Sequence, residues 1–288
     1  MSIFLFTLIS ETSILKLKDG VLMKKIDLEE LKKIQLEILD YVVKFCKENK
    51  INYWIDCGTL LGAVRHKGYI PWDDDIDIGM LRGDFNRFME LFNKHSKRYK
   101  FYSVENNKKF NYPFGKVLDT ETVLYEPTEK RGNRLAINID VIVYDNAPDD
   151  ENELAKMFKK RNIYNMFKSV QISPVATTKK FHITNIIRIP CHYILKLLPK
   201  AYFSKKIAEN AKKYQNMETK RVGNFTAVFR MVCDKHVFDK FVDIEFEGKK
   251  YKAPVGYDEW LKAFYGDYIK LPPVEKRIST HKFVAYKK

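Results

Sequence analysis

Apolar side chains recur at steps of three and four along residues 26–49, and Glu and Lys fill the positions between them. This spacing predicts an amphipathic helix with one buried face. The same periodicity predicts further helices over 81–99, 151–167, 184–198, 201–217 and 257–266. From residue 151 onward the pattern is therefore mainly helical.

Strand character is concentrated in the first half of the chain. Short runs rich in β-branched and aromatic residues predict extended segments at 51–58, at 69–80 and several times between 101 and 145. Further strands are expected around 246–254. A first half that contains strands and a mainly helical second half predict an α+β architecture.

The first ten residues, MSIFLFTLIS, are apolar but lack the features of a secretory signal. No basic segment precedes them, no small-residue cleavage site follows, and the run is too short to span a bilayer. Residues 1–22 are either a translation extension in front of Met23 or a loosely attached strand, and both interpretations stay open. The rest of the sequence contains no transmembrane segment, which predicts a cytoplasmic protein.

The charge of the chain changes which partners are expected. The 288 residues include 52 Lys and Arg against 37 Asp and Glu, a formal net charge of +15, so the surface attracts polyanions. Nucleotide phosphates, phosphorylated glycans and anionic membranes remain candidates, whereas no recognisable nucleic-acid motif is present and nucleic acid is not expected. The four cysteines form no CxxC pair, which indicates reduced thiols rather than disulfides or a zinc site.

One acidic run, PWDDDIDIGM at 71–80, stands out in this basic chain. In a strand, Asp75 and Asp77 share one face while Ile76 and Ile78 share the other, so the apolar pair can anchor the strand and the carboxylates can project into a cleft. Two carboxylates at that spacing suit Mg²⁺. A second cation would complete the arrangement used for in-line phosphoryl displacement.

Asp140 is the candidate third carboxylate, because it lies in another alternating segment, AINIDVIVYD. A strand beside the first would bring it against Asp75 and Asp77, where it could ligate metal or accept the proton of an attacking hydroxyl. Asp73 and Asp74 either bind metal or cap the loop. The alternative for the whole cluster is a solvated turn, which does not require isoleucine at alternating positions.

The upstream segment DCGTLLGAVRHKG, residues 56–68, predicts a phosphate-binding turn. Gly58 permits close backbone approach, and Thr59 offers a hydroxyl and an N–H at the start of a short helix, where anions bind. Arg65 and Lys67 follow, and next to the carboxylates they are candidates for neutralising phosphate oxygens. Ordinary surface charge is the alternative for this RHK triplet.

Residues 58–80, GTLLGAVRHKGYIPWDDDIDIGM, resemble the signature of the LicD family, which is related to fukutin and fukutin-related protein within the nucleotidyltransferase superfamily. That superfamily combines a Gly-Ser/Thr turn, an Asp-x-Asp/Glu strand and a later strand carboxylate. The matching positions here are Gly58-Thr59, Asp75-Ile76-Asp77 and Asp140. The likeness extends over roughly residues 24–281 and places Lys116, in FGKVLDTET, where the family commonly has a strand lysine.

The resemblance implies a nucleotidyltransferase-like mixed β-sheet flanked by helices. Residues 23–148 would form the catalytic core, and 149–288 would complete the LicD domain and set acceptor specificity. Asp75, Asp77 and Asp140 would be catalytic metal ligands for one or two Mg²⁺ ions, with Mn²⁺ as a substitute. Gly58, Thr59, Arg65, Lys67 and Lys116 would bind substrate. The chain has DVIVYD at 140–145 where the family often has DIFPLD, which leaves the role of Asp145 open.

The activity implied by the resemblance is transfer of a phospho-substituent, with phosphocholine from CDP-choline expected first, onto a hydroxyl of a lipopolysaccharide- or teichoic-acid-type glycan precursor. The alternatives are transfer of an NMP group to a small molecule or protein, and a non-enzymatic polyanion-binding protein. The acceptor can be lipid-linked. The apolar and basic stretch 181–206 is either a core segment or a peripheral contact with the inner face of a membrane.

Overall fold

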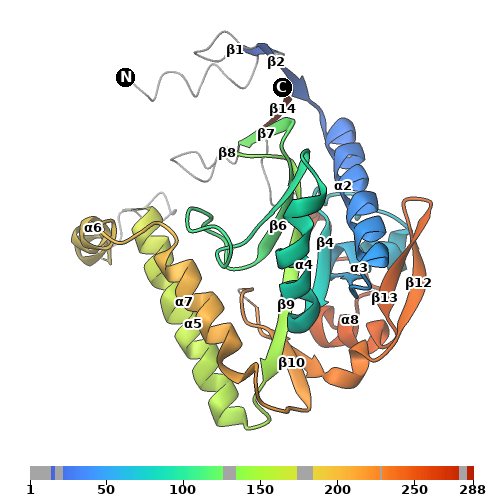
Figure 1. The fold of residues 1–288 in the computed structure, drawn as a ribbon. Helices are drawn as coiled ribbons and strands as arrows, with labels where there is room; N and C mark the ends of the chain where they lie inside the picture. The colour runs from blue at the N-terminus through green and yellow to red at the C-terminus, as the bar shows by residue number, and fades with distance from the viewer. Residues whose placement is uncertain (1–13, 17–21, 126–133, 174–183, 228, 279–283) are drawn as a thin grey trace.

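A mixed sheet of seven strands lies at the centre of the computed structural model, which describes residues 14–16, 22–125, 134–173, 184–227, 229–278 and 284–288 (Figure 1). Its main path runs β11-β10-β9-β4-β3, and β6 joins β5 to β9. The strands are β3 (Trp54–Ile55), β4 (Asp77–Leu81), β5 (Tyr99–Tyr102), β6 (Gly115–Asp119), β9 (Asn138–Ala147), β10 (Arg221–Asn224) and β11 (Met231–Asp234).

Strand β9 organises this sheet because three strands pair along its length. It is parallel to β4 and antiparallel to β6 near its start and to β10 near its end. The side chains of Ile139, Val141 and Val143 on β9 and of Ile78 on β4 are fully buried. Alternating apolar residues therefore fix which face of these two strands the polar side chains take.

The first predicted helix is confirmed as α2 (Leu28–Glu48). Asp27 caps its start by accepting a hydrogen bond from the Glu30 N–H at 2.8 Å. Its apolar face packs on α4 (Arg82–His95) through edge-to-face ring contacts of Phe45 with Phe88 and Phe92. The short helix expected after residue 56 is α3 (Cys57–His66), and the helix near the C-terminus is α8 (Tyr257–Tyr265).

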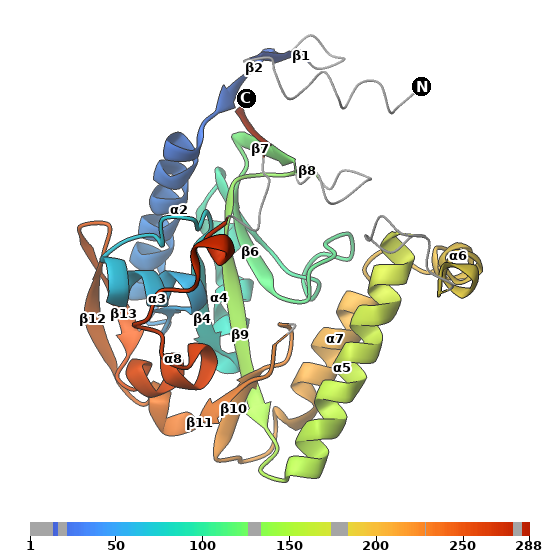
Figure 2. The same cartoon turned by 180° about the vertical axis from the view of Figure 1, so that it is seen from behind.

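Three helices form an arm to one side of the central sheet, as both ribbon views show (Figures 1 and 2). They are α5 (Glu151–Ile172), α6 (Thr184–Leu195) and α7 (Tyr202–Ala211). Helix α6 continues through Pro190 rather than ending there. In the part of the chain that the structure describes, none of the helices combines the length and apolar character needed to cross a bilayer.

A second sheet joins the two ends of the described chain. Its strand order is β1-β2-β14-β7-β8. Residues 14–16 of the expected extension form β1, and residues 1–13 and 17–21 lie outside the described residues. The bounds are β1 (Ile14–Lys16), β2 (Leu22–Ile26), β7 (Thr122–Tyr125), β8 (Arg134–Leu135) and β14 (Val284–Lys287), with a separate hairpin of β12 (Phe241–Phe246) and β13 (Lys249–Pro254).

The predicted fold class is confirmed: a mixed sheet is flanked by helices, and helices dominate residues 151–214. Strands return beyond that stretch, where β10 and β11 extend the central sheet begun by the first half of the chain. The division into 23–148 and 149–288 stays a prediction, and the central sheet contains strands from both sides of that boundary.

The described residues also contain 3-10 turns at η1 (Lys212–Tyr214), η2 (Lys235–Phe238) and η3 (Val274–Lys276).

Candidate active site

Parallel pairing of β4 and β9 sets two carboxylates side by side. Asp77 is the first residue of β4 and lies directly opposite Asp140 in the register of the pair. The N–H of Asp140 donates to the carbonyl of Ile76 at 2.8 Å, which locks this register. The adjacency expected from the two alternating segments is therefore present in the structure.

Asp75 reaches the same region from a loop and not from the strand. The sequence pattern predicts that Asp75 and Asp77 share a strand face, but β4 begins only at Asp77. Asp75 nevertheless lines the same cavity as Asp140 and Lys116. The loop that precedes β4 thus brings the Asp75 carboxylate to the site.

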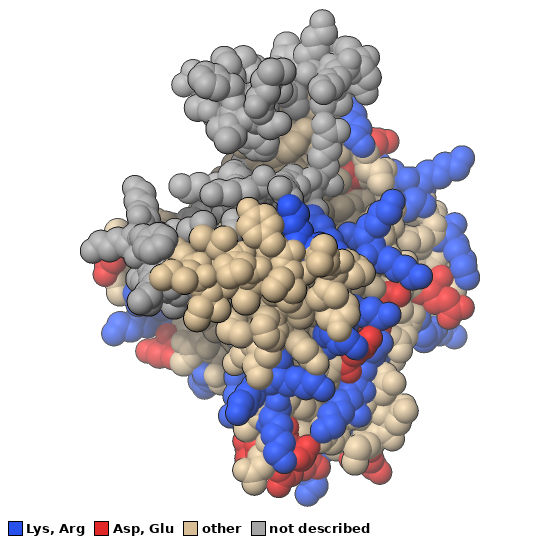
Figure 3. All heavy atoms as spheres, turned by 90° about the vertical axis from the view of Figure 1, so that its left-hand side faces the viewer, with Lys and Arg blue, Asp and Glu red and all other residues tan. Residues whose placement is uncertain are grey.

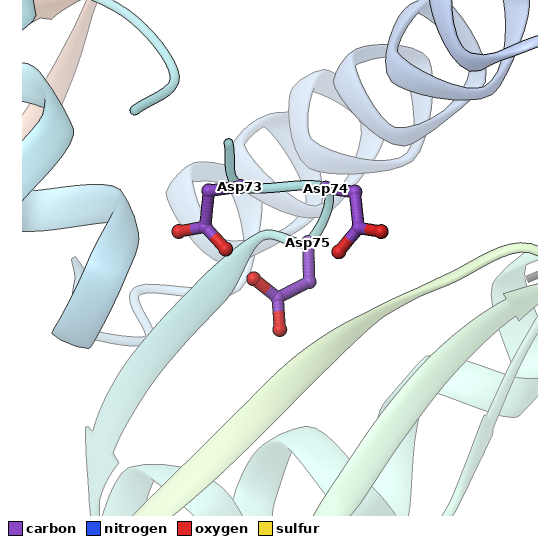
Figure 4. Close-up of side chains that lie close together, drawn as sticks. All are labelled: Asp73, Asp74 and Asp75. Carbon is purple, nitrogen blue, oxygen red and sulfur yellow. The ribbon is translucent and has the colours of Figure 1, made fainter. Parts of the chain in front are cut away.

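The loop before β4 gathers three consecutive aspartates. Carboxylate oxygens of Asp73, Asp74 and Asp75 lie within 4.8 Å of one another (Figure 4). Gln35 of α2 holds this loop, since its side-chain amide donates to the carbonyl of Asp74 at 3.0 Å. The same amide lies 3.4 Å from the carbonyl of Asn138, so one glutamine connects the acidic loop to β9.

Helix α3 begins against the carboxylates. The Thr59 hydroxyl accepts a hydrogen bond from the Asp77 N–H at 2.8 Å, which ties the first turn of α3 to the start of β4. Gly58 lies so close to Asp73 that a Cβ at this position would approach the Asp73 Oδ2 to 2.6 Å. Glycine at this position therefore leaves room for the Asp73 carboxylate, which a Cβ would displace.

The N-cap residue of α3, Asp56, turns away from the helix. Its carboxylate accepts hydrogen bonds from the Tyr144 hydroxyl at 2.5 Å and the Trp260 Nε1–H at 3.1 Å, and it makes no side-chain cap to α3. Cys57 follows with φ of 46°, a left-handed conformation that is unfavourable for a non-glycine residue. Burial, followed by the charges of nearby aspartates, raises the pKa of the Cys57 thiol well above its usual value.

Arg65 and Lys67 lie at the opposite end of α3 from Gly58 and Thr59. Six residues of helix place Arg65 about 9 Å along the axis from Thr59. Arg65 donates through Nη1 to the carbonyl of Tyr268 at 2.9 Å, and Lys67 is exposed at the C-cap with φ of 61°. The structure thus brings Gly58 and Thr59 to the carboxylates but leaves Arg65 and Lys67 at the far end of the helix.

Lys116 on β6 lies inside the carboxylate cluster. Its ammonium donates to Asp140 Oδ1 at 2.5 Å and to Asn138 Oδ1 at 3.0 Å. It also lies over the rings of Tyr112 and Phe114, at 5.0 and 5.4 Å from their centroids. Its charge therefore balances a carboxylate as well as facing the cavity.

A cavity of about 200 Å³ lies at the centre of this arrangement. Its polar lining combines two carboxylates, the Lys116 ammonium and two side-chain amides, and aromatic and aliphatic side chains line the remainder. The lining residues are Leu31, Gln35, Asp75, Tyr112, Phe114, Lys116, Leu124, Ile137, Asn138 and Asp140. An apolar cleft with a few convergent charged groups is typical of a small-molecule site.

The electrostatics of the cluster favour binding of a cation. Loss of solvent, followed by the charges of Asp75 and Asp140, raises the pKa of Asp77 well above its usual value. A divalent cation beside Asp77 would reverse this effect. Because carboxylate oxygens are the ligands that Mg²⁺ prefers, the predicted ligands Asp75, Asp77 and Asp140 offer suitable donor chemistry, while the three carboxylates with oxygens within 4.8 Å of one another are Asp73, Asp74 and Asp75.

Sequence reasoning missed Gln35, Asn138, Tyr112 and Phe114. Gln35 carried a usable signal, because it interrupts the buried face of α2 next to Ile34. A polar residue within an apolar stripe usually has a specific partner. The two aromatic residues had no such signal among 37 Tyr and Phe in the chain.

Asp145, whose role the sequence left open, belongs to a different cluster. It is fully buried and binds Arg82 in a bidentate pair, with Nε–Oδ1 at 2.7 Å and Nη2–Oδ2 at 2.8 Å. Arg82 also donates to Glu105 at 2.9 Å, and Lys212 donates to Glu105 at 2.7 Å. Two cations and two anions thus pair at the end of β9 away from Asp140.

Comparison with known proteins shows to which family this sequence is related. The domain described as "LicD/FKTN/FKRP, nucleotidyltransferase domain" matches residues 50–192. Lipopolysaccharide cholinephosphotransferase LicD of Haemophilus influenzae is 30% identical over 271 residues, covering 92% of this chain and 99% of that protein. The ribitol 5-phosphate transferase FKRP of mouse and of human is 40% identical over 55 residues, or 19% of this chain and 11% of that protein. The chain belongs to the LicD family.

Proposed function

We propose that this protein is a metal-dependent phosphotransferase that moves a phospho-substituent from a CDP-linked donor onto a hydroxyl of a cell-surface glycan precursor. The observation that carries the proposal is the register of β4 and β9, which sets Asp77 against Asp140 beside a cavity shared with Asp75. The relative that aligns along almost its whole length is a lipopolysaccharide cholinephosphotransferase, and the shorter matches are ribitol 5-phosphate transferases.

Asp75, Asp77 and Asp140 would hold Mg²⁺, which when bound neutralises the charge of the donor phosphates. Thr59 fixes the backbone of Asp77 and so orients its carboxylate. Lys116 holds the Asp140 carboxylate in place through their 2.5 Å contact. Asp140 would also accept the proton of the attacking acceptor hydroxyl.

The N-terminus of α3 is the proposed seat of a donor phosphate. The backbone N–H groups at Gly58 and Thr59 begin a ten-residue helix, and a helix N-terminus favours negative charge. The placement of Arg65 and Lys67 at the other end of α3 suits more distant parts of the substrates, such as an anionic acceptor.

Phosphocholine is the proposed transferred group. A quaternary ammonium binds to aromatic faces, and the cavity presents Tyr112 and Phe114. The Lys116 ammonium lies over both rings, so choline would have to replace these contacts when it binds. A ribitol- or glycerol-phosphate donor carries no quaternary ammonium for these rings.

The test is a transfer assay with purified protein, a glycan acceptor and CDP-choline, CDP-ribitol or CDP-glycerol as donor. Wild-type protein is expected to prefer CDP-choline and to lose activity in excess EDTA. Asp75→Asn is expected to lose transfer, whereas the matched control Asp239→Asn, at an exposed position, keeps it. Full activity in EDTA would rule out the metal mechanism.

A donor labelled separately in its nucleotide and its choline distinguishes the alternative reaction. Choline label on the acceptor supports the proposal. Nucleotide label on the acceptor would instead identify an NMP transferase, the reaction suggested by the nucleotidyltransferase description of the matched domain.

A further inference from the structure

Helix α6 packs with its polar side inward. Asn185 and His192 are buried, and the His192 Nδ1 lies 2.8 Å from the carbonyl of Val170 on α5. Arg188, one turn from each of them, donates to the carbonyls of Ser169 and Ser173. A helix on a water-exposed surface normally buries its apolar side and exposes its polar side, so the orientation of α6 is inverted.

The outward side of α6 and the segment after it is apolar. The exposed fraction is 71% for Ile187 and 86% for Leu197. We call this surface the apolar face. Its main members are Ile186, Ile187, Tyr193, Ile194 and Leu197. An exposed apolar area of this kind marks a protein or membrane contact.

Positive charge surrounds the apolar face. The 55 residues from 154 to 208 contain twelve Lys and Arg and no Asp or Glu. Figure 3 shows the result: a broad tan area with blue Lys and Arg side chains along its border. Exposed lysines of this arm include Lys159, Lys160, Lys196, Lys200 and Lys205.

We propose that the apolar face docks on the surface of a bilayer that contains anionic phospholipids. An apolar centre with a cationic border complements acyl chains beneath negative headgroups. A second copy of this chain would bring the same cationic border against the first and be repelled. With twelve residues, α6 is about 18 Å long and cannot cross a hydrocarbon core of about 30 Å, so it lies in the plane of the interface.

The arm also contacts the loop that lines the active-site cavity. The Ser204 hydroxyl on α7 donates to the Asn111 carbonyl at 2.9 Å, and the Lys168 ammonium of α5 lies 5.6 Å from the centre of the Tyr112 ring. Docking would therefore hold this cavity close to the membrane, where a lipid-linked glycan is presented. This consequence, unlike the docking itself, rests on the proposed function.

The docking is tested by co-sedimentation with vesicles, without donor or acceptor. Vesicles containing phosphatidylglycerol are expected to bind the protein at least tenfold more tightly than pure phosphatidylcholine, and salt should weaken the binding. Ile187→Glu/Leu197→Glu should weaken it at least tenfold, and Lys196→Glu/Lys200→Glu should weaken it selectively for anionic vesicles. The matched control is Val255→Glu/Ile269→Glu, two exposed apolar positions far from the arm, which should bind normally.

Failure of wild-type protein to bind either vesicle would overturn the proposal, as would unchanged binding of Ile187→Glu/Leu197→Glu. If the wild-type protein does not bind vesicles but forms a dimer, and Ile187→Glu/Leu197→Glu dissociates that dimer, the apolar face is a self-association surface instead. Failure of the proposed transfer reaction is separable, because Asp77→Asn should still bind vesicles. Conversely, Ile187→Glu/Leu197→Glu should retain transfer onto a water-soluble acceptor.

Discussion

The two ends of strand β9 carry the same type of residue in opposite electrostatic settings. Asp145, near the C-terminal end, is paired with Arg82. Arg82 also pairs with Glu105, which in turn pairs with Lys212, so two cations face two anions. We call these four residues the paired cluster. At the N-terminal end, Asp75, Asp77 and Asp140 form a carboxylate cluster in which the negative charges reinforce one another.

The pKa values of Arg82 and Glu105 reflect this difference, whereas burial raises the pKa of Asp145 in spite of its pair with Arg82. Burial alone would lower the pKa of Arg82, but hydrogen bonds and charge from Asp145 outweigh it and raise that pKa. For the Glu105 carboxylate, burial alone would raise the pKa, but Arg82 and Lys212 keep it below its ordinary value. Asp77 shows the opposite behaviour, with burial and neighbouring carboxylates acting together. The paired cluster balances its charges within the protein, whereas the carboxylate cluster carries an excess of negative charge that costs stability while no cation is bound.

Asp77→Asn should give the largest effect. Transfer is expected to fall by about 10³-fold or more, equivalent to about 4 kcal/mol of activation free energy. The free energy of unfolding, measured by urea denaturation in EDTA, should rise by about 1 kcal/mol because repulsion from Asp75 and Asp140 is removed. If Asp77→Asn transfers at the wild-type rate, or is clearly less stable than wild type, the proposed difference between the two ends of β9 is wrong.

Asp145→Asn should act almost entirely on stability. Breaking the buried bidentate pair leaves Arg82 with Glu105 as its carboxylate partner and should lower the free energy of unfolding by about 3 kcal/mol. Urea denaturation measures the loss. Arg82→Met/Asp145→Leu serves as a control and should recover part of it, because no buried charge of this pair is then left alone. A loss below about 1 kcal/mol would mean that the pair is not structural.

Lys116→Met tests how far the carboxylate cluster depends on its own cation. The change removes the partner of Asp140 and should lower the free energy of unfolding by about 2 kcal/mol. Adding Asp140→Asn should restore most of that stability, since the carboxylate that needs the ammonium is gone. A double-mutant cycle measures this coupling, and simple additivity of the two single changes would show that none exists.

Glu105→Gln should give the smallest effect and the clearest pH dependence. The pKa of Glu105 is lowered from its ordinary value of 4.5, so its contribution is fully present above that pH. The contribution is lost as the pH falls through the lower pKa of the folded protein. We expect the variant to be about 1 kcal/mol less stable at pH 7, with a difference that shrinks as the pH falls below 4.5. A difference that stays constant as the pH falls would exclude this linkage.

Much of the fold could be predicted from the sequence because its signals are local. Periodicity located α2 and α4, and alternation placed strands at 69–80 and within 101–145. Alternation also placed Asp140 on the opposite strand face from Ile139 and Val141. The exact start of β4 at Asp77 was not predictable, because it depends on Gln35 holding the preceding loop from 39 residues away.

The candidate site was predictable only in part. Asp75, Asp77, Asp140, Gly58 and Thr59 are brought together, whereas Arg65 and Lys67 are drawn to the far end of α3. Nearness in sequence misled here, because a helix carries residues six positions apart about 9 Å along its axis. Tyr112 and Phe114 reach the cavity through a loop whose course no local pattern specifies.

The sequence by itself determined the elements, the family signature and the concentration of carboxylates on one strand edge, because periodicity and residue chemistry are properties of adjacent positions. Tertiary structure decided which charges meet. It paired Asp145 with Arg82, 63 residues away, and placed Lys116 against Asp140. It also turned the apolar side of α6 outward, an orientation that helical periodicity cannot distinguish from burial. Long-range packing sets these outcomes, since charge pairing and exposure depend on neighbours distant in the chain.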